Sequence, residues 1–213
     1  MIVSHEHRFV FMKTRKTAGT SVEIALSRVC GPDDVITPVL EEPLRASLGG
    51  RGPQNYESPP LERKAFNHMP VSMVRRMLGR TRFESYFSFA VDRNPWDAVV
   101  SLYHWHVRDN PDPAPFADYV GSDAVEVFAT KQHRIYRLDG AVAVDRVLRY
   151  ESLGEELAAV WSELGLPGDP DLPHAKAGSR PRAASYRDYY DDASRDRVAE
   201  LFAAPIAELG YEF

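Results

Sequence analysis

The fold of this chain is set by residues 9–21, FVFMKTRKTAGTS, in which an apolar run leads into a short basic segment with small residues. The consecutive apolar residues 9–12 are typical of a parallel strand that is buried on both faces. Small and hydroxyl side chains follow, and apolar residues then recur at helical spacing, at Val22, Ala25, Leu26 and Val29. The stretch therefore predicts a strand, a tight turn and a helix that ends before Gly31-Pro32.

A second strand and helix are predicted further along the chain. The apolar run Phe87–Val91 is typical of another inner strand. Asn94 is a good N-cap residue, and Pro95 fits the first helical position that follows it. We therefore expect a helix that begins at Pro95, with Asn94, Pro95 and Asp97 serving to cap it.

Two further segments continue the pattern. Residues 142–150 predict a third strand, and residues 152–155 have the capping-box pattern before a helix that ends at Gly165. A last helix carries apolar residues over 198–209, and Pro205 is expected to kink it. Strands that alternate with helices predict an α/β fold, with three α/β/α layers built on a mainly parallel central sheet.

The composition limits the class of protein. The 213 residues are 44% hydrophobic and 27% charged, which predicts a single domain over residues 1–213 with a sizeable core. Residues 31–67 lose the periodicity and carry recurrent proline and glycine, so we expect an irregular loop there, as a candidate lid over an acceptor site. The formal net charge of −5 argues against a nucleic-acid-binding protein.

The cellular location is predicted from cysteine usage and hydropathy. Cys30 is the only cysteine, so no internal disulfide can form and nothing indicates an oxidising compartment. No apolar run is long enough for a membrane span, and the first residues lack the pattern of a signal peptide. We therefore expect a cytoplasmic protein that does not bind membranes, with no expectation about its oligomeric state.

The basic segment after the first strand has the character of an anion-binding loop. Small residues between Lys13 and Ser21 let successive backbone N–H groups converge on an anion at the start of the helix, where the helix dipole favours negative charge. Lys13, Arg15 and Lys16 add positive charge to this loop. The loop is not a Walker A motif, because the chain has no Gly-Lys pair, and ordinary P-loop kinases are therefore disfavoured.

Residues 15–21 resemble the 5′-phosphosulfate loop of the sulfotransferases, especially of their carbohydrate-type branch. The resemblance implies a P-loop-like domain that binds 3′-phosphoadenosine-5′-phosphosulfate (PAPS), with Lys16 contacting its bridging and phosphate oxygens. A proline often precedes this lysine in the family, whereas this chain has Arg15. The loop residues implied to bind PAPS are Arg15, Lys16, Thr17, Ala18, Gly19, Thr20 and Ser21.

Residues 93–103 carry a second resemblance to the same family. The family's 3′-phosphate segment reads Arg-Asn-Pro, then an aspartate and a Ser-x-Tyr, and this chain matches each of those positions. The resemblance implies that Arg93 and Ser101 bind the 3′-phosphate of PAPS. An arginine fork suits a dianionic phosphate, and a helical serine hydroxyl can complete the shell.

The general base is suggested by a weaker resemblance at Phe66–Pro70. In the family a histidine before a proline-containing turn takes the acceptor's proton, and His68 is the matching residue. A neutral imidazole can take a proton near neutral pH, which suits this role. Carbohydrate-type members can use a glutamate instead, and the carboxylates of the irregular loop then become the alternatives, namely Glu41, Glu42 and Glu57.

Two more residues are implied to contact PAPS. Tyr150 lies in a segment that resembles the family's Tyr-Glu pair near the adenine, although packing in the core explains this tyrosine equally well. Arg180 lies in a basic segment that resembles the C-terminal part of carbohydrate-type sulfotransferases, and it is expected at the phosphate or adenine side. An exposed basic loop is the alternative explanation for Arg180.

Together these motifs predict a PAPS-dependent sulfotransferase, which transfers a sulfuryl group in line to a hydroxyl or amine of a small-molecule or carbohydrate acceptor. His68 would deprotonate the acceptor, and Lys16 would stabilise charge on the leaving phosphate, with no metal required. One alternative is a small-molecule kinase with an atypical P-loop, because Asp92 ends an apolar strand as a magnesium-binding carboxylate would. The other alternative is a nucleotide-binding regulator without turnover.

Overall fold

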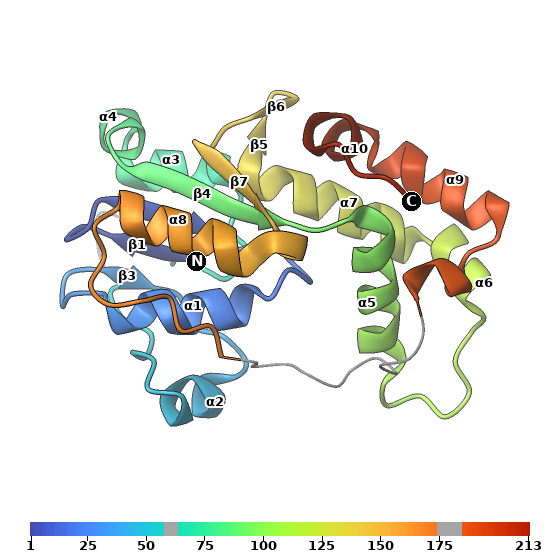
Figure 1. The fold of residues 1–213 in the computed structure, drawn as a ribbon, viewed down its shortest axis with the longest axis horizontal. Coiled ribbons are helices and arrows are strands. Elements are labelled where there is room, and N and C mark those ends of the chain that lie inside the picture. Colours follow the sequence, from blue (N-terminus) through green and yellow to red (C-terminus); the bar gives the residue numbers. More distant parts are fainter. Residues whose placement is uncertain (58–63, 174–184) are drawn as a thin grey trace. The chain divides into compact units, whose positions relative to one another are not determined.

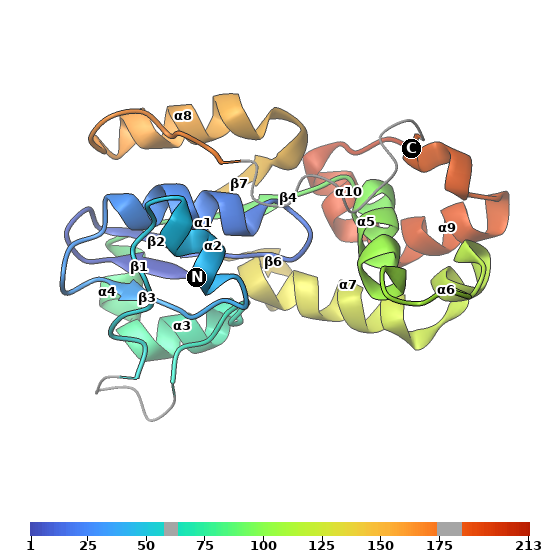
Figure 2. The same ribbon diagram turned by 90° about the horizontal axis from the view of Figure 1, so that it is seen from below.

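The structure is a computed structural model, and it describes residues 1–57, 64–173 and 185–213. The chain divides into two compact units, drawn in Figures 1 and 2. The first consists of Met1–Asp92 and His133–Ala175, and the second of Arg93–Gln132 and Lys176–Phe213. Each unit has a hydrophobic core of its own. The single domain expected over residues 1–213 stays a prediction.

A five-stranded sheet forms the centre of the first unit, in the order β3-β1-β2-β4-β7. Its strands are β1 (Ile2–Ser4), β2 (Phe9–Met12), β3 (Val35–Ile36), β4 (Phe87–Asp92) and β7 (Arg146–Arg149). β2 pairs in parallel with β4, and β4 pairs in parallel with β7, whereas β1 is antiparallel to both β2 and β3. The predicted α/β fold is confirmed, with parallel strands at the centre of a mixed sheet.

Helices cover both faces of this sheet, as Figure 2 shows. Helices α1 (Gly19–Arg28) and α8 (Leu153–Glu163) lie on one face, and α3 (Val71–Leu78) and α4 (Arg80–Glu84) lie on the other. Successive strand residues point to opposite faces. Phe9, Phe11 and Phe89 therefore belong to one core cluster, and Val10, Met12 and Ala90 belong to the other.

Three local predictions for the first unit need correction. The irregular stretch 31–67 contains β3 and the short helix α2 (Glu42–Ser47), which are too short to show a periodic pattern. The third strand is only β7, because Val142 belongs to a hairpin of β5 (Arg137–Leu138) and β6 (Ala141–Val142).

The third correction concerns the start of α8. Ser152 is the N-cap residue, but no side-chain capping bond is present. Its hydroxyl instead donates to Glu156 Oε1 over 2.7 Å, and Glu156 Oε2 accepts from the backbone N–H of Arg149 over 3.1 Å. The predicted capping box with Glu155 was therefore wrong. Glu156, the next residue, makes the contacts back to Ser152 and to the end of β7.

The second unit is helical. Its elements include α5 (Pro95–Val107), α6 (Phe116–Gly121), α9 (Asp192–Leu201) and α10 (Ala203–Leu209), and α7 (Asp123–Tyr136) begins in it and ends in the first unit. The predicted start of α5 is confirmed: Asn94 is the N-cap residue, and its side chain accepts from the backbone N–H groups of Trp96 and Asp97. No helix in the described ranges has the length and apolar character needed to cross a membrane.

The last part of the chain forms two helices instead of one kinked helix. α9 ends at Leu201, and α10 begins at Ala203. Pro205 has no N–H to donate to the carbonyl of Leu201, and its ring would clash with that carbonyl in a continuous helix. The proline therefore separates the two helices at Phe202, which caps both.

Candidate functional site

The loop between β2 and α1 has an unusual backbone. Lys16 and Ala18 are left-handed, with φ of 63° and 56°, while Thr17 between them is not. A left-handed non-glycine residue costs about 1–2 kcal/mol, and such residues concentrate at functional sites. Alternating backbone handedness turns successive N–H groups toward one side, which is the geometry of an anion-binding nest.

The first turn of α1 is suited to a negative ligand. Ala18 is the N-cap residue and provides no side-chain cap, and the first turn carries no acidic residue. The positive end of the helix dipole is therefore not neutralised by a side chain of the cap or the first turn. Thr20 and Ser21 place two hydroxyl groups in this turn, both largely buried. Backbone N–H groups and hydroxyls at a helix start form a common type of anion site.

A hydrogen-bond chain fixes the loop to the end of β4. The Thr14 hydroxyl donates to the carbonyl oxygen of Val91, and the hydroxyls of Thr14 and Thr17 are 2.7 Å apart. Thr17 is buried. Its side chain is therefore used inside the protein, so that any contact of Thr17 with a ligand runs through its backbone N–H.

A buried ion-pair network lies behind the loop. Lys13, predicted as part of the anion-binding cluster, is only 4% exposed, and its Nζ lies 2.5 Å from Glu23 Oε2. Arg45 Nη2 lies 3.3 Å from the same oxygen, and the amino group of Met1 donates to Oε1. Burial alone would raise the pKa of Glu23, but the Met1 amino group and Lys13 outweigh it and hold this pKa at about 2. The charge of Lys13 is thus used within the protein.

Sequence reasoning missed Glu23 and Arg45. A signal was present for Glu23, because it is an acidic residue among the apolar positions of α1. It is fully buried, and so is Arg45 from α2. A charged residue that is fully buried is normally paired, and the network therefore ties the segment 31–67 to the base of the anion loop.

Gly19 allows the loop to pass close to Lys13. A Cβ at position 19 would lie 2.7 Å from Lys13 Cγ and 3.3 Å from the carbonyl oxygen of Thr14. Because Lys13 Nζ is held by Glu23, its side chain cannot move away freely. Only a glycine fits at the first helical residue of α1.

Gly19→Ala is therefore expected to lower the free energy of unfolding by about 1–3 kcal/mol, the usual cost of overpacking a buried site. Urea denaturation measures this change. Gly154→Ala is the matched control, because a Cβ at Gly154 in the first turn of α8 meets nothing within 4 Å. That variant should be as stable as wild type or more stable, by up to about 1 kcal/mol. Equal effects of the two substitutions would contradict the close contact at Gly19.

His68 lies against the same loop. Its Nδ1 lies 2.9 Å from the carbonyl oxygen of Lys13, so Nδ1 carries the proton and donates it to that oxygen. The other ring nitrogen, Nε2, then keeps a lone pair, and it makes no hydrogen bond to any residue of the described part of the chain. His68 is left-handed as well, with φ of 61°. The structure thus brings the expected base and the anion loop together within the first unit.

The environment of His68 disfavours its charged form. Burial and the positive charges of Lys13 and Arg15 lower the pKa of His68 to about 3, although its hydrogen bond to the Lys13 carbonyl acts in the opposite direction. The imidazole is therefore neutral at physiological pH. The pKa near 6.5 expected of an ordinary histidine does not apply here.

Other expected site residues of the first unit have structural contacts. Tyr150 begins a short 3-10 turn directly after β7 and packs against the core cluster of α1 and α8. The carboxylate of Asp92, the residue on which the kinase alternative depends, accepts a hydrogen bond from the buried hydroxyl of Tyr136.

Of the alternative bases, Glu42 pairs with Arg45 at 3.3 Å and Glu57 pairs with Lys64 at 2.5 Å. Glu41 is the N-cap residue of α2.

Arg93 and Ser101 lie in the second unit: Arg93 directly precedes Asn94, the N-cap residue of α5, and Ser101 lies in the middle of the helix. The Nε and Nη2 atoms of Arg93 donate to Asp97 Oδ2 over 3.0 and 2.7 Å. Asp97 was expected to cap the helix, but its carboxylate holds the guanidinium of Arg93. Arg93, Asp97 and Ser101 follow one another at intervals of four, which places Asp97 and Ser101 on one face of α5. Arg180 lies outside the described residues.

Comparison with known proteins gives two similarities. No family model matches the chain. An uncharacterized protein from Archaeoglobus fulgidus is 33% identical over 106 residues, which cover 49% of this chain and 88% of that protein. The two proteins belong to one family, and the match brings no activity with it. The crystal structure of a sulfotransferase from Alicyclobacillus acidocaldarius is similar with a TM-score of 0.46 and 16% identity, over 97% of this chain and 96% of that one. A similarity of this size assigns no role to any residue.

Proposed function

We propose that this protein is a PAPS-dependent sulfotransferase that acts on a hydroxyl or amine of a small-molecule or carbohydrate acceptor. The observation that carries the proposal is the contact between His68 and the start of the anion loop that holds Lys16. In-line transfer needs a proton acceptor on the attacking side and a positive group on the leaving side. Lys16 in the loop is the candidate for the positive group, and His68, which contacts the start of the loop, is the candidate for the proton acceptor.

The loop is the proposed site for the 5′-phosphosulfate. Its left-handed residues Lys16 and Ala18, and the start of α1 without a side-chain cap, suit an anion. Donors are the backbone N–H groups of residues 17–19, the hydroxyls of Thr20 and Ser21, and the amine of Lys16. The fully buried Glu23 is already paired with Lys13, so its negative charge is compensated before a ligand binds.

The proposed chemistry uses His68 in one fixed tautomer. The Nδ1–H group donates to the Lys13 carbonyl, so Nε2 is the atom that takes the acceptor's proton. The acceptor oxygen or nitrogen forms a bond to sulfur as the bond from sulfur to the bridging phosphate oxygen breaks. That oxygen leaves with the electron pair as part of adenosine 3′,5′-bisphosphate, and Lys16 stabilises the charge that develops on it.

The low pKa of His68 fits a base that works beside a bound anion. An imidazole with a pKa of about 3 is neutral but is a weak base. Negative charge near an imidazole favours the imidazolium and raises its pKa. Binding of the multiply charged PAPS therefore strengthens the base at the moment when it is needed.

Arg93 and Ser101 are the proposed ligands of the 3′-phosphate. The ion pair with Asp97 fixes the guanidinium of Arg93 before the ligand arrives, which reduces the entropy lost on binding. Arginine offers a planar set of donors that matches a phosphate. Tyr150 is the proposed contact of the adenine in the first unit, and Arg180 stays a prediction.

Arg93→Ala is expected to weaken binding of adenosine 3′,5′-bisphosphate by ~10- to 100-fold, the loss of one charge-assisted phosphate contact. Adenosine 5′-phosphosulfate lacks the 3′-phosphate, so its affinity should change little. Isothermal titration calorimetry measures both. Arg197→Ala is the control, because Arg197 also pairs with acidic side chains of the second unit, at its surface. Equal losses for the two nucleotides would show that Arg93 does not read the 3′-phosphate.

The activity is tested by incubating the protein with PAPS and a panel of phenols, amines and sugars, without metal, and measuring release of adenosine 3′,5′-bisphosphate. Acceptor-dependent release that is lost in Lys16→Ala supports the proposal. Turnover with ATP and magnesium but not with PAPS would identify a kinase instead. Tight binding of the bisphosphate without any turnover would identify a regulator.

A further inference from the structure

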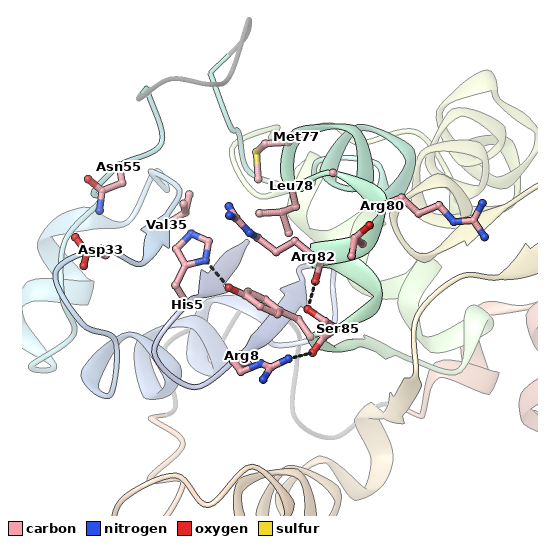
Figure 3. Close-up of a pocket in the computed structure, with 13 residues that line it drawn as sticks. His5, Arg8, Asp33, Val35, Asn55, Met77, Leu78, Arg80, Arg82 and Ser85 are labelled. Atoms are coloured by element: carbon pink, nitrogen blue, oxygen red, sulfur yellow. Dashed lines mark hydrogen bonds between the residues drawn. The ribbon is translucent and has the colours of Figure 1, made fainter.

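A pocket of about 960 Å³ lies at the other end of the sheet of the first unit. Figure 3 shows it between the β1–β2 turn, the start of β3 and helix α4. Because His5 and Arg8 precede β2 and Ser85 and Tyr86 precede β4, the pocket lies at the amino ends of the parallel strands. The anion loop follows the carboxyl end of β2, so the two sites are at opposite ends of the strands. The volume is in the range of small-molecule sites.

One arginine of the pocket is unpaired within the part of the chain that the structure describes. The guanidinium of Arg82 makes no hydrogen bond or ion pair with any residue in the described ranges, and in Figure 3 it points toward His5 and Val35. Its neighbour Arg80 behaves differently: it pairs with Glu84 at 2.8 Å and points away from the other lining side chains. Arg82 is therefore a positive charge of the pocket lining that is available to a ligand.

The floor of the pocket is held in place by a polar cluster. His5 Nδ1 and the Tyr86 hydroxyl are 2.9 Å apart, and Arg8 Nη2 donates to the carbonyl oxygen of Ser85 over 3.0 Å. The Arg8 guanidinium also lies 6.0 Å from the centre of the Tyr86 ring. These contacts orient a hydroxyl, an imidazole and a second positive charge in the same pocket before any ligand binds.

The backbone at Arg8 is strained in a way that glycine would relieve. Arg8 is left-handed, with φ of 56°, at the turn between β1 and β2. Glycine is the usual residue at such a position, because it has no Cβ to clash. An arginine at this position therefore costs stability relative to glycine. Asn55, another lining residue, is also left-handed, with φ of 52°.

The rest of the lining gives the pocket an apolar side. Val35 is buried beneath it, and Met77 and Leu78 at the end of α3 are partly buried along its wall. Figure 3 shows Met77 and Leu78 above Arg82, opposite His5. Asp33 is the acidic residue of the lining, and in the described ranges no carboxylate pairs with the lining residues Arg8 and Arg82. The pocket thus combines a net positive charge with an apolar wall.

We propose that this pocket binds a small organic anion that carries a phosphate, sulfate or carboxylate group on an apolar body. Arg82 binds the anionic group, the Tyr86 hydroxyl and His5 add hydrogen bonds to it, and the apolar body lies against Met77 and Leu78. The site is separate from the anion loop and does not depend on the proposed transferase activity.

The test uses 1-naphthyl phosphate as the probe, titrated by calorimetry into wild type, Arg82→Gln and the matched control Arg76→Gln. Arg76 is an exposed arginine of α3 that does not line the pocket. Removing the charge at Arg82 should weaken binding about tenfold or more, and Arg76→Gln should change it less than twofold. Neutral 1-naphthol should bind more than tenfold more weakly than the ester. 1-Naphthalenesulfonate and 1-naphthoate then identify the preferred anionic group.

Backbone amide shifts locate the probe. Shifts at residues 5–8 and 77–86 that persist in Lys16→Ala support the proposal. Shifts confined to residues 13–21, or an affinity that Arg82→Gln leaves unchanged, overturn it. So does the lack of any binding at millimolar concentrations of all three anions.

Discussion

Replacing Lys16 with alanine is expected to lower turnover with PAPS at least ~10²-fold, while the affinity for adenosine 3′,5′-bisphosphate falls much less. The reason is that, in the proposed mechanism, the amine stabilises charge that develops only as the bond to the leaving phosphate oxygen breaks. Product release in single-turnover experiments and calorimetric binding measure the two quantities separately. A variant with turnover within threefold of wild type contradicts this role.

Lys16→Gly separates the amine from the backbone. Lys16 has φ of 63°, where glycine is more stable than any residue with a Cβ, by roughly 1 kcal/mol or more. Lys16→Gly should therefore unfold at a higher urea concentration than Lys16→Ala but should be equally inactive. Lys131→Ala removes an exposed lysine of α7 and should retain full turnover. If glycine restored activity, the loop conformation and not the amine would be the important property.

The substitution His68→Asn is expected to reduce kcat by ~10² to 10⁴ with the affinity for adenosine 3′,5′-bisphosphate almost unchanged. Asparagine keeps a hydrogen-bond donor for the Lys13 carbonyl but cannot accept a proton. It is also among the non-glycine residues that best tolerate a left-handed backbone, so the φ of 61° at this position is not an obstacle to folding. His106→Asn, which changes an exposed histidine of α5, should leave kcat within twofold of wild type.

The pH dependence gives an independent test of His68. A base is lost as pH falls through its pKa, and the pKa of about 3 in the free protein predicts that kcat/KM stays flat from pH 8 to about pH 5. If PAPS binds as proposed, its negative charge raises the pKa of His68, so the fall in kcat should begin at a higher pH than the fall in kcat/KM. An ordinary histidine pKa, which is all that the sequence offers, predicts a fall in kcat near pH 6.5. A decrease of kcat/KM as the pH falls through 6.5 would show that another group, or a differently placed histidine, is the base.

The same pKa also predicts a stability effect. A histidine whose folded pKa lies below its unfolded value binds fewer protons when folded, so its contribution to stability is complete above pH 6.5 and is lost as pH falls toward 3. His68→Asn should therefore reduce the loss of stability between these pH values. This effect is expected even if the residue has no part in turnover, and it tests the described environment of His68 by itself.

The local features of the fold were predictable because neighbouring residues determine them. The strand, loop and helix over residues 9–28 follow from one apolar run and its helical continuation, and the start of α5 follows from Asn94-Pro95. The strands β1 and β3 have three and two residues. Strands this short show no period, and only their pairing in the sheet defines them.

Contacts between distant residues were not predictable in the same way. In the sequence, Lys13 belongs to a basic loop and Glu23 is an acidic residue among apolar positions, but nothing local indicates that either of them pairs with Arg45. Only the tertiary structure buries the three side chains together. The hydrogen bond from His68 to Lys13 likewise joins residues 55 positions apart. The low pKa of His68 is a property of that tertiary arrangement, so a reference value was the only one that the sequence offered.

The left-handed residues of the candidate site have a consequence for protein engineering. Lys16, Ala18 and His68 each keep a side chain where glycine would be the more stable choice. A screen for heat resistance would therefore favour glycine at these positions. Glycine at Lys16 or His68 would remove the amine or the imidazole of the candidate site. Stability and the proposed activity therefore oppose each other at these three positions. Of the three, only Ala18 can be changed to glycine without removing the amine or the imidazole of the proposed site.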